Sequence, residues 1–120
     1  MFDLFMKGRP ATRTARAFVA AVRAEHLDEA RRHATPELAR KLDPGVMAHD
    51  AELQRAYESV RRSRAIDGGF VGEWTRGCVT GKIDAGPEVW LVMSKLDGSW
   101  LVADVRVDVQ PSECVFNDPH

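Results

Sequence analysis

Near its C-terminal end the chain reads Trp90-Leu91-Val92-Met93-Ser94-Lys95-Leu96-Asp97-Gly98-Ser99-Trp100-Leu101-Val102-Ala103-Asp104-Val105-Arg106-Val107. Two apolar runs flank the Asp97-Gly98 pair, and this arrangement is a strong short-range signal for a β-hairpin. Gly98 can adopt the positive φ that a two-residue turn requires, and Asp97 tolerates it better than most residues. The stretch therefore predicts two antiparallel strands, over about 88–96 and 99–109.

The two predicted strands differ in how their apolar residues are distributed. The second alternates strictly, which predicts two faces: Leu101, Ala103, Val105, Val107 and Val109 on one, and Trp100, Val102, Asp104, Arg106 and Asp108 on the other. The first carries large apolar residues on both faces, so we expect helices on one side of it and a partner on the other. A local apolar patch without a partner is the alternative.

The first half of the chain follows the 3.6-residue period of amphipathic helices. Pro10 suits a first helical turn, and we expect a helix over 10–25. Asp28 is a candidate cap for a short helix over 28–34, and Thr35 followed by Pro36 predicts the start of another over 36–42. A fourth helix is predicted over 47–63. The buried stripes of the first and fourth helices are Ala15, Phe18, Val19 and Val22, and Leu53, Ala56, Tyr57 and Val60.

Asp67-Gly68-Gly69 separates this helical half from a half with a period of two. Beyond it we expect strands over 70–76 and 78–83, interrupted at Gly77, and then the hairpin. Helices followed by antiparallel strands predict an α+β fold, with the helices packed on a curved sheet of three to four strands. The predicted organisation is a single domain over 1–120, with a lead-in over 1–9, a body over 10–109 and a mobile tail over 111–120.

Composition and charge exclude some classes of function. The chain has 120 residues and a formal net charge of −1, which gives it no general attraction for nucleic acid or for an anionic membrane. Basic residues are in excess before residue 67 and acidic residues after it, and we interpret the basic excess as solvated helix faces. We therefore expect neither a nucleic-acid partner nor a membrane partner.

Cys78 and Cys114 do not form a metal-binding or disulfide-scaffold pattern. Free thiols in a reducing cytoplasm are the default interpretation, and a single disulfide is the alternative if the protein is exported. The segment from Met1 to Lys7 lacks the basic start, the apolar core and the cleavage site of a signal peptide. The predicted location is cytoplasmic, and an exported form with a trimmed leader remains an alternative.

Two stretches resemble a known family. Leu27-Asp28-Glu29-Ala30-Arg31-Arg32-His33-Ala34-Thr35-Pro36-Glu37-Leu38 is a short helix running into a helix that starts at Thr-Pro-Glu-Leu, and Leu96-Asp97-Gly98-Ser99-Trp100-Leu101-Val102-Ala103-Asp104-Val105 resembles a closing hairpin. With the order of elements over 10–109, they resemble the nuclear transport factor 2-like superfamily. The resemblance implies a cystatin-like cone, in which a curved sheet wraps around a long helix. Members of the superfamily include ketosteroid isomerases, dehydratases and polyketide cyclases, and also noncatalytic binding and dimerisation domains, so the resemblance implies any of these functions. Many members pair through their sheets.

Acid–base chemistry of the isomerase type needs a carboxylate base near a tyrosine or a protonated acid. The weak candidates are Tyr57, the only tyrosine, with Asp104 and Glu73. We interpret Tyr57 as a core residue and Asp104 as a solvent-facing strand residue. His26, Glu29 and His33 share a helical spacing but are an incomplete set for zinc, so we expect surface residues, no metal and no cofactor. Neither the cysteines nor Ser94 and Ser99 lie in a nucleophile motif.

Aromatic residues gather in the predicted sheet, and we expect the ligand-binding or interface residues among Phe70, Trp74, Trp90, Trp100 and Tyr57. Trp74 should share a face with Phe70, and Trp90 and Trp100 should stack across the hairpin. The cluster is interpreted as core, as a dimer interface or as a ligand pocket. The predicted function is a noncatalytic module that forms a homodimer through the face of Trp90 and Trp100, with a small apolar molecule as a further candidate ligand. The alternatives are a small isomerase, dehydratase or cyclase, and an accessory domain with a protein partner.

Overall fold

The computed structural model describes residues 2–63, 66–73, 75–84 and 86–115, with side chains from Arg9 onward except those of 66–68. The helices and strands follow one another along the chain as helices first and strands afterwards, as predicted. They are α1 (Phe2–Arg23), α2 (Leu27–Arg32), α3 (Pro36–Lys41), α4 (Pro44–Met47), α5 (Ala51–Arg62), β1 (Ile66–Gly72), β2 (Arg76–Ile83), β3 (Glu88–Leu96), β4 (Ser99–Val107) and the 3₁₀ turn η1 (Ser112–Cys114).

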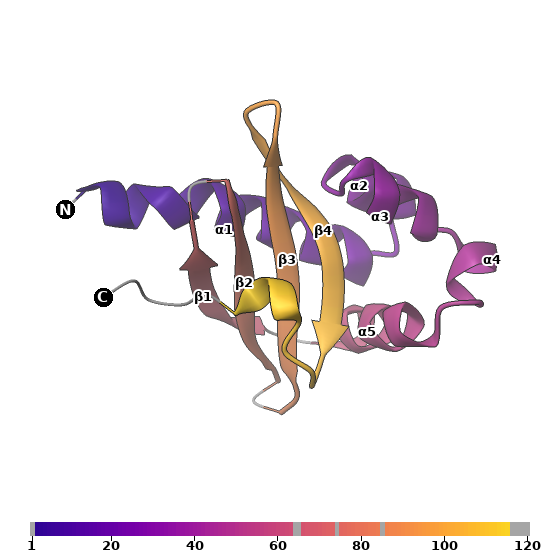
Figure 1. Cartoon of the computed structure of the whole chain (residues 1–120). Helices are drawn as coiled ribbons and strands as arrows, with labels where there is room; N and C mark the ends of the chain where they lie inside the picture. The colour runs from indigo at the N-terminus through magenta and orange to yellow at the C-terminus, as the bar shows by residue number, and fades with distance from the viewer. Residues whose placement is uncertain (1, 64–65, 74, 85, 116–120) are drawn as a thin grey trace.

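The four strands form one antiparallel sheet in the order β1-β2-β3-β4 (Figure 1). Helix α1 runs behind the sheet from β1 to β4, while α2, α3 and α5 lie beyond the β4 edge. The η1 turn lies on the opposite side of the sheet, in front of β2 and β3. The predicted α+β class, with helices on an antiparallel sheet, is therefore confirmed.

Helix α1 is longer than its sequence pattern predicts. It begins at Phe2, so the predicted lead-in over 1–9 is helical from its second residue, and Pro10 lies inside the helix. The proline removes one backbone N–H, and from Ala11 onward the apolar face of the helix is buried against the sheet. Ala11, Ala15, Phe18 and Val22 are each at most 1% exposed on that face, and the predicted stripe is confirmed.

The caps of the short helices agree only in part with the sequence pattern. The Thr35 hydroxyl accepts a hydrogen bond from Leu38 N at 3.3 Å, as predicted for the start of α3. Asp28 does not cap α2, which starts one residue before it; its carboxylate instead accepts from Arg31 at 2.8 Å. The predicted helix over 47–63 is two helices, α4 and α5, and Asp50 caps the second through Leu53 N at 3.1 Å.

The first strand lies four residues earlier than predicted. β1 contains the two glycines that were interpreted as a boundary, and the turn to β2 follows Gly72. Gly72 and Gly77 pair across the strands, and a Cβ on Gly72 would come within 2.4 Å of the Gly77 Cα. This pair of glycines therefore allows the close backbone approach at the turn, which glycine alone permits without displacement.

The closing hairpin and its turn are confirmed, with one difference at the end of its second strand. β3 has the predicted bounds, β4 ends two residues before the predicted end, and φ is 51° at Asp97 and 81° at Gly98. Two central residues with positive φ are the pattern of the two-residue turns that favour Asp-Gly.

The predicted faces of β4 are wrong in its first half because the strand contains an irregularity. Val92 pairs with Asp104 and Met93 pairs with Val102, so Ala103 is an extra residue without a partner on β3. Such a bulge shifts the alternation by one residue. As a result Trp100 and Val102 lie on the same side of the sheet as Val105, and they are buried there.

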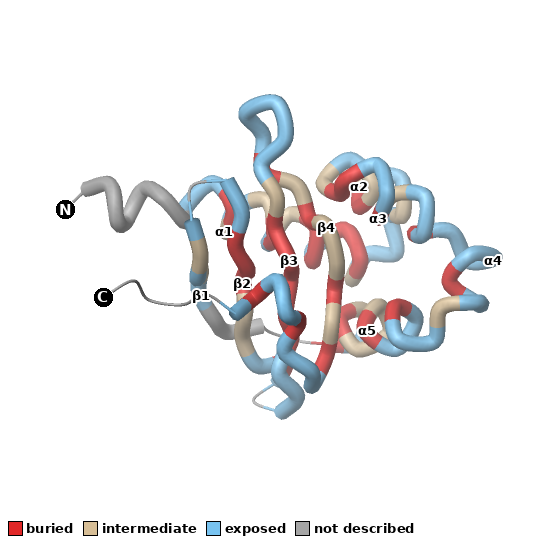
Figure 2. Tube along the Cα trace, in the orientation of Figure 1, coloured by how far each residue is buried: buried red, intermediate tan, exposed pale blue. Residues whose placement is uncertain are grey.

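One hydrophobic core joins the helices to the face of the sheet that they cover, here called the inner face. Its side chains on the sheet are those of Phe70, Val79, Val89, Leu91, Met93, Trp100, Val102, Val105 and Val107. Figure 2 shows buried segments on both sides of this helix–sheet contact. At the β4 edge, Thr35 N donates to Val102 O and Val102 N donates to His33 O, both at 2.8 Å. Arg55 Nη2 donates to Val107 O at 3.1 Å, so this edge is covered at two points.

Candidate functional site

The helices leave one face of the sheet without a helical layer, and we call it the outer face. The strand register aligns its residues in rows, with Val71, Cys78, Val92 and Asp104 in one row and Thr80, Trp90 and Arg106 in the next. The other members are Arg76, Lys82, Glu88, Ser94, Leu101 and Ala103. Apolar side chains occupy the middle rows, and charged side chains lie at the ends of the rows.

A short C-terminal turn covers part of the outer face. Cys114, on η1, forms a disulfide with Cys78 on β2, with the two Cα atoms 5.7 Å apart. Both cysteines are buried and form a small cluster with Trp90 and Val92. The default expectation of two free thiols is therefore wrong. The bridge attaches 111–115, the first part of the tail predicted to be mobile, to the sheet, and residues 116–120 lie outside the described part.

Trp90 lies beneath this turn with an unsatisfied polar atom. It is only 9% exposed, and its buried indole Nε1 has no hydrogen-bond partner among the residues that the structure describes. The nearby Thr80 hydroxyl donates elsewhere, to Val89 O at 3.1 Å. A buried N–H without an acceptor costs free energy, so the covered state of Trp90 carries an intrinsic penalty.

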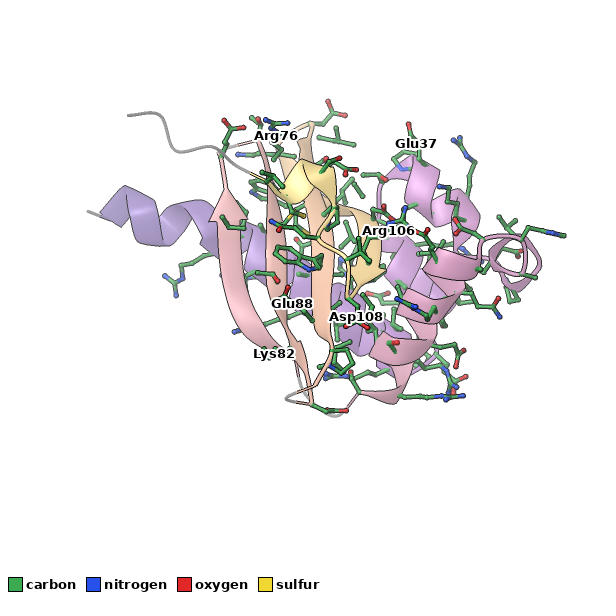
Figure 3. All side chains as sticks on the ribbon, turned by 60° about the horizontal axis from the view of Figure 1, so that its bottom comes forward. Glu37, Arg76, Lys82, Glu88, Arg106 and Asp108 are labelled. Atoms are coloured by element: carbon green, nitrogen blue, oxygen red, sulfur yellow. A yellow bond between two sulfur atoms is a disulfide. The ribbon has the colours of Figure 1, made fainter. Side chains whose placement is uncertain are left out.

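Charged residues of both signs surround the apolar rows. Figure 3 shows Arg76, Lys82, Glu88 and Arg106 distributed around this part of the sheet, with Asp108 just beyond β4. Arg106 joins the sheet to α5, because one guanidinium nitrogen lies 2.9 Å from Glu52 and the other 3.1 Å from Asp104. Arg76 pairs with Glu73 at 2.8 Å.

A groove of about 340 Å³ separates the start of α5 from the end of β4, and it is lined by Ala51, Glu52, Arg55, Arg106, Val107 and Val109. Its two arginines already have partners. Arg106 binds Glu52 and Asp104, and Arg55 donates to a backbone carbonyl of β4. The groove thus lies along the contact by which α5 is attached to the sheet.

The three acid–base candidates lie in separate surroundings. Tyr57 is half-buried on α5, and burial, with Glu25 and Glu58 nearby, raises the pKa of its hydroxyl. Asp104 lies on the outer face, where burial raises the pKa of its carboxyl against the opposing effects of Val105 N and Arg106. Glu73 is exposed in the β1–β2 turn and pairs with Arg76. The structure does not assemble these residues into one pocket.

The histidine group does not form a ligand cluster. His33 Nε2 lies 3.5 Å from Glu29, while His26 precedes α2 and is exposed. Within the described part of the chain, no group of three histidine, cysteine or carboxylate side chains is arranged to hold a metal ion.

The aromatic residues divide between the two faces. Phe70 and Trp100 meet edge to face on the inner side, with ring centroids 5.7 Å apart. Trp90 pairs with Arg106 and Trp100 pairs with Lys95, so the predicted stack of the two indoles is not formed. Trp74 lies outside the described residues. Only Trp90 of the predicted aromatic cluster belongs to the outer face, and the shared Trp90–Trp100 face is a prediction that the bulge overturns.

Sequence reasoning missed the two cysteines and Arg106 as members of this site. A spacing of 36 residues does not indicate whether two cysteines pair, since their pairing depends on where the C-terminal turn meets the sheet. Arg106 was assigned correctly to the polar face of its strand, but its contact with Glu52 joins elements 54 residues apart.

Comparison with known proteins adds no relative. No protein-family model, no curated protein and no solved structure matches this chain. None of the helices in the described residues combines the length and the apolar character needed to cross a bilayer.

Proposed function

We propose that this chain is a noncatalytic interaction module that pairs with a second copy of itself through the outer face. One observation carries the proposal: among the described residues, every helix packs behind the sheet or beyond its β4 edge, and the outer face is covered by a short turn (Figure 1). The resemblance to the nuclear transport factor 2-like superfamily points the same way, because many of its members pair through their sheets.

The composition of the outer face fits a protein interface. Its exposed apolar groups include the half-buried Leu101 on β4 and Val115 on the turn, which is 56% exposed, while Trp90 and Val92 lie beneath the turn. Apolar groups surrounded by charged side chains are the usual anatomy of an interface. Val71 adds an exposed apolar group near the open β1 edge, where it is 40% exposed.

The charges favour a second copy over a strongly charged partner. The face and its margin carry basic and acidic residues in equal number: Arg76, Lys82 and Arg106, and Glu88, Asp104 and Asp108. Glu113 on the turn adds one further carboxylate. A nearly neutral face of mixed sign does not repel itself, and in a two-fold dimer each basic group can approach an acidic group of the partner.

The alternative of a small isomerase, dehydratase or cyclase has less support. It needs Tyr57 near a carboxylate, whereas Asp104 and Glu73 lie in different surroundings from Tyr57 and from each other. A ligand inside a cone would also compete with core side chains. Phe18, Leu91 and Met93 fill the space between α1 and the sheet and are each at most 1% exposed.

Sedimentation velocity over a range of protein concentrations tests the proposal. Val71→Asp would place a charge among the exposed apolar groups of the paired surface, and we expect it to weaken the dimer by at least about tenfold, the equivalent of 1.4 kcal/mol. Val46→Asp is the matched control, because Val46 is 44% exposed on α4, away from the sheet. A wild-type protein that stays monomeric at every concentration, or equal effects of the two substitutions, would refute pairing through this face.

A further inference from the structure

Within residues 86–115, the turn on the outer face is held to the sheet by its disulfide and by two buried residues. Pro111 and Cys114 are buried, while Ser112, Glu113 and Val115 are exposed. Hydrogen bonds from Cys114 N to Pro111 O, from Val115 N to Ser112 O and from Gln110 Nε2 to Cys114 O all stay inside the segment 110–115. They shape the turn without attaching it to the sheet.

Two features of the covered state oppose it. The indole Nε1 of Trp90 has no acceptor beneath the turn, and exposure to water would satisfy it. Glu113 of the turn also contributes, less than burial does, to the raised pKa of Asp104. Against these effects stand the burial of Pro111 and Cys114 and the covalent bond between Cys78 and Cys114.

We propose that the Cys78–Cys114 disulfide is a redox latch, which holds the C-terminal turn over Trp90 when oxidised and releases it when reduced. The reductant is a dithiol. It gives two electrons and two protons, becomes a disulfide itself, and leaves Cys78 and Cys114 as thiols. In the reverse step a disulfide takes two electrons and two protons from Cys78 and Cys114 and becomes a dithiol, and the turn closes again.

The rest of the fold does not depend on the latch. The cluster of Cys78, Trp90, Val92 and Cys114 is separate from the main core on the inner face. Strand pairing from β1 to β4 is complete without the turn. Reduction should therefore open the outer face locally and expose Trp90 and Val92, while Trp100 stays in its contact with Phe70.

Hydrogen exchange of the tryptophan indole N–H groups, followed by ¹⁵N NMR, tests the latch. The Trp90 signal is assigned with Trp90→Phe. We expect its exchange to accelerate by at least about tenfold on reduction with a thioredoxin-type dithiol, as in local opening, with the Trp100 signal unchanged. Cys114→Ser should reproduce the reduced state, and Ser112→Ala, in the same turn with the bridge intact, should keep the protection.

Two results would overturn the latch. One is unchanged Trp90 exchange after mass spectrometry has shown both thiols free, since the turn would then be held without the bridge. The other is a bridge that the dithiol fails to reduce in the folded protein. The exchange measurements are made at a concentration at which sedimentation shows monomers, and this separates the latch from pairing. The latch predicts that reduction opens the turn at this concentration, whether or not the protein dimerises when concentrated.

Discussion

The same four strands present two faces that are covered in different ways. On the inner face, Val89, Leu91 and Met93 of β3 are each at most 1% exposed beneath helices that precede the sheet in sequence. On the outer face, Trp90 and Val92 of the same strand are 9% and 6% exposed beneath a turn that a disulfide attaches. Similar burial therefore has two origins. On the inner face it comes from helix packing, which contributes to stability, and on the outer face it comes from a covalently attached turn, which leaves an indole N–H unsatisfied.

The difference indicates which face stabilises the fold and which face is available for binding. Inner-face side chains interlock with α1 and α5 in one continuous core, so removing one leaves a cavity. On the outer face, Cys78, Trp90 and Val92 form a smaller cluster with Cys114 of the turn, separate from the main core. A face that is apolar but lightly covered is typical of an interaction surface.

The largest expected difference between the faces comes from a pair of leucine substitutions. Leu91→Ala, on the inner face, should lower the free energy of unfolding by about 2–5 kcal/mol, because the site cannot collapse around the lost atoms. Leu101→Ala, on the half-exposed outer face, should cost less than about 1 kcal/mol. Urea denaturation monitored by circular dichroism measures both. Equal losses would mean that the outer face is packed as tightly as the inner one.

A smaller effect is expected at the glycine beneath Phe70. A Cβ on Gly77 would lie 2.5 Å from the Phe70 ring and 2.8 Å from Val71 O, so Gly77→Ala should cost about 1–3 kcal/mol as overpacking. Gly69→Ala, on the neighbouring strand, is the control, since its Cβ would meet nothing within 4 Å.

Near-ultraviolet circular dichroism should change with Gly77→Ala, because displacing Phe70 breaks its contact with Trp100, whose ring centroid lies 5.7 Å away. The Gly69→Ala spectrum should match that of the wild type. A Gly77→Ala protein with unchanged stability and spectrum would show that Phe70 does not lie over this glycine.

Local signals in the sequence predicted much of the fold. The Asp97-Gly98 turn and the Thr35 cap depend on residues a few positions apart, and both are confirmed. The stripe that includes Phe18 and Val22 is buried as its period predicts. These features could be predicted because their physical cause is contained within one or two turns of chain.

What could not be predicted depends on contacts between distant segments. The extra residue Ala103 becomes apparent only from the pairing of β4 with β3, and it moves Trp100 from the face of Trp90 to the opposite one. The Cys78–Cys114 bridge depends on the path of the chain after β4. Helix α1 also begins before Pro10, which the preference of proline for a first helical turn did not predict.

The smallest expected effect is a dependence of stability on pH that belongs to the outer face alone. Burial raises the pKa of Asp104 above its value in the unfolded chain, with Glu113 of the turn adding to the rise. Between the unfolded and folded pKa values the folded protein binds more protons than the unfolded one, so stability falls as pH rises through that window. Asp104→Asn should remove this fall, since the amide oxygen can still accept from Val105 N, 2.9 Å from the carboxylate in the wild type.

Urea unfolding of the oxidised wild type and of Asp104→Asn, measured from pH 4 upward, gives the two slopes. The slope of the reduced wild type should lie between them, because releasing the turn removes Glu113 from the vicinity of Asp104 and so lowers the pKa of Asp104 toward its ordinary value. Identical slopes for oxidised and reduced protein would mean that Asp104 does not respond to the turn. The pH dependence thus reports, from a single carboxyl group, whether the outer face is covered or open.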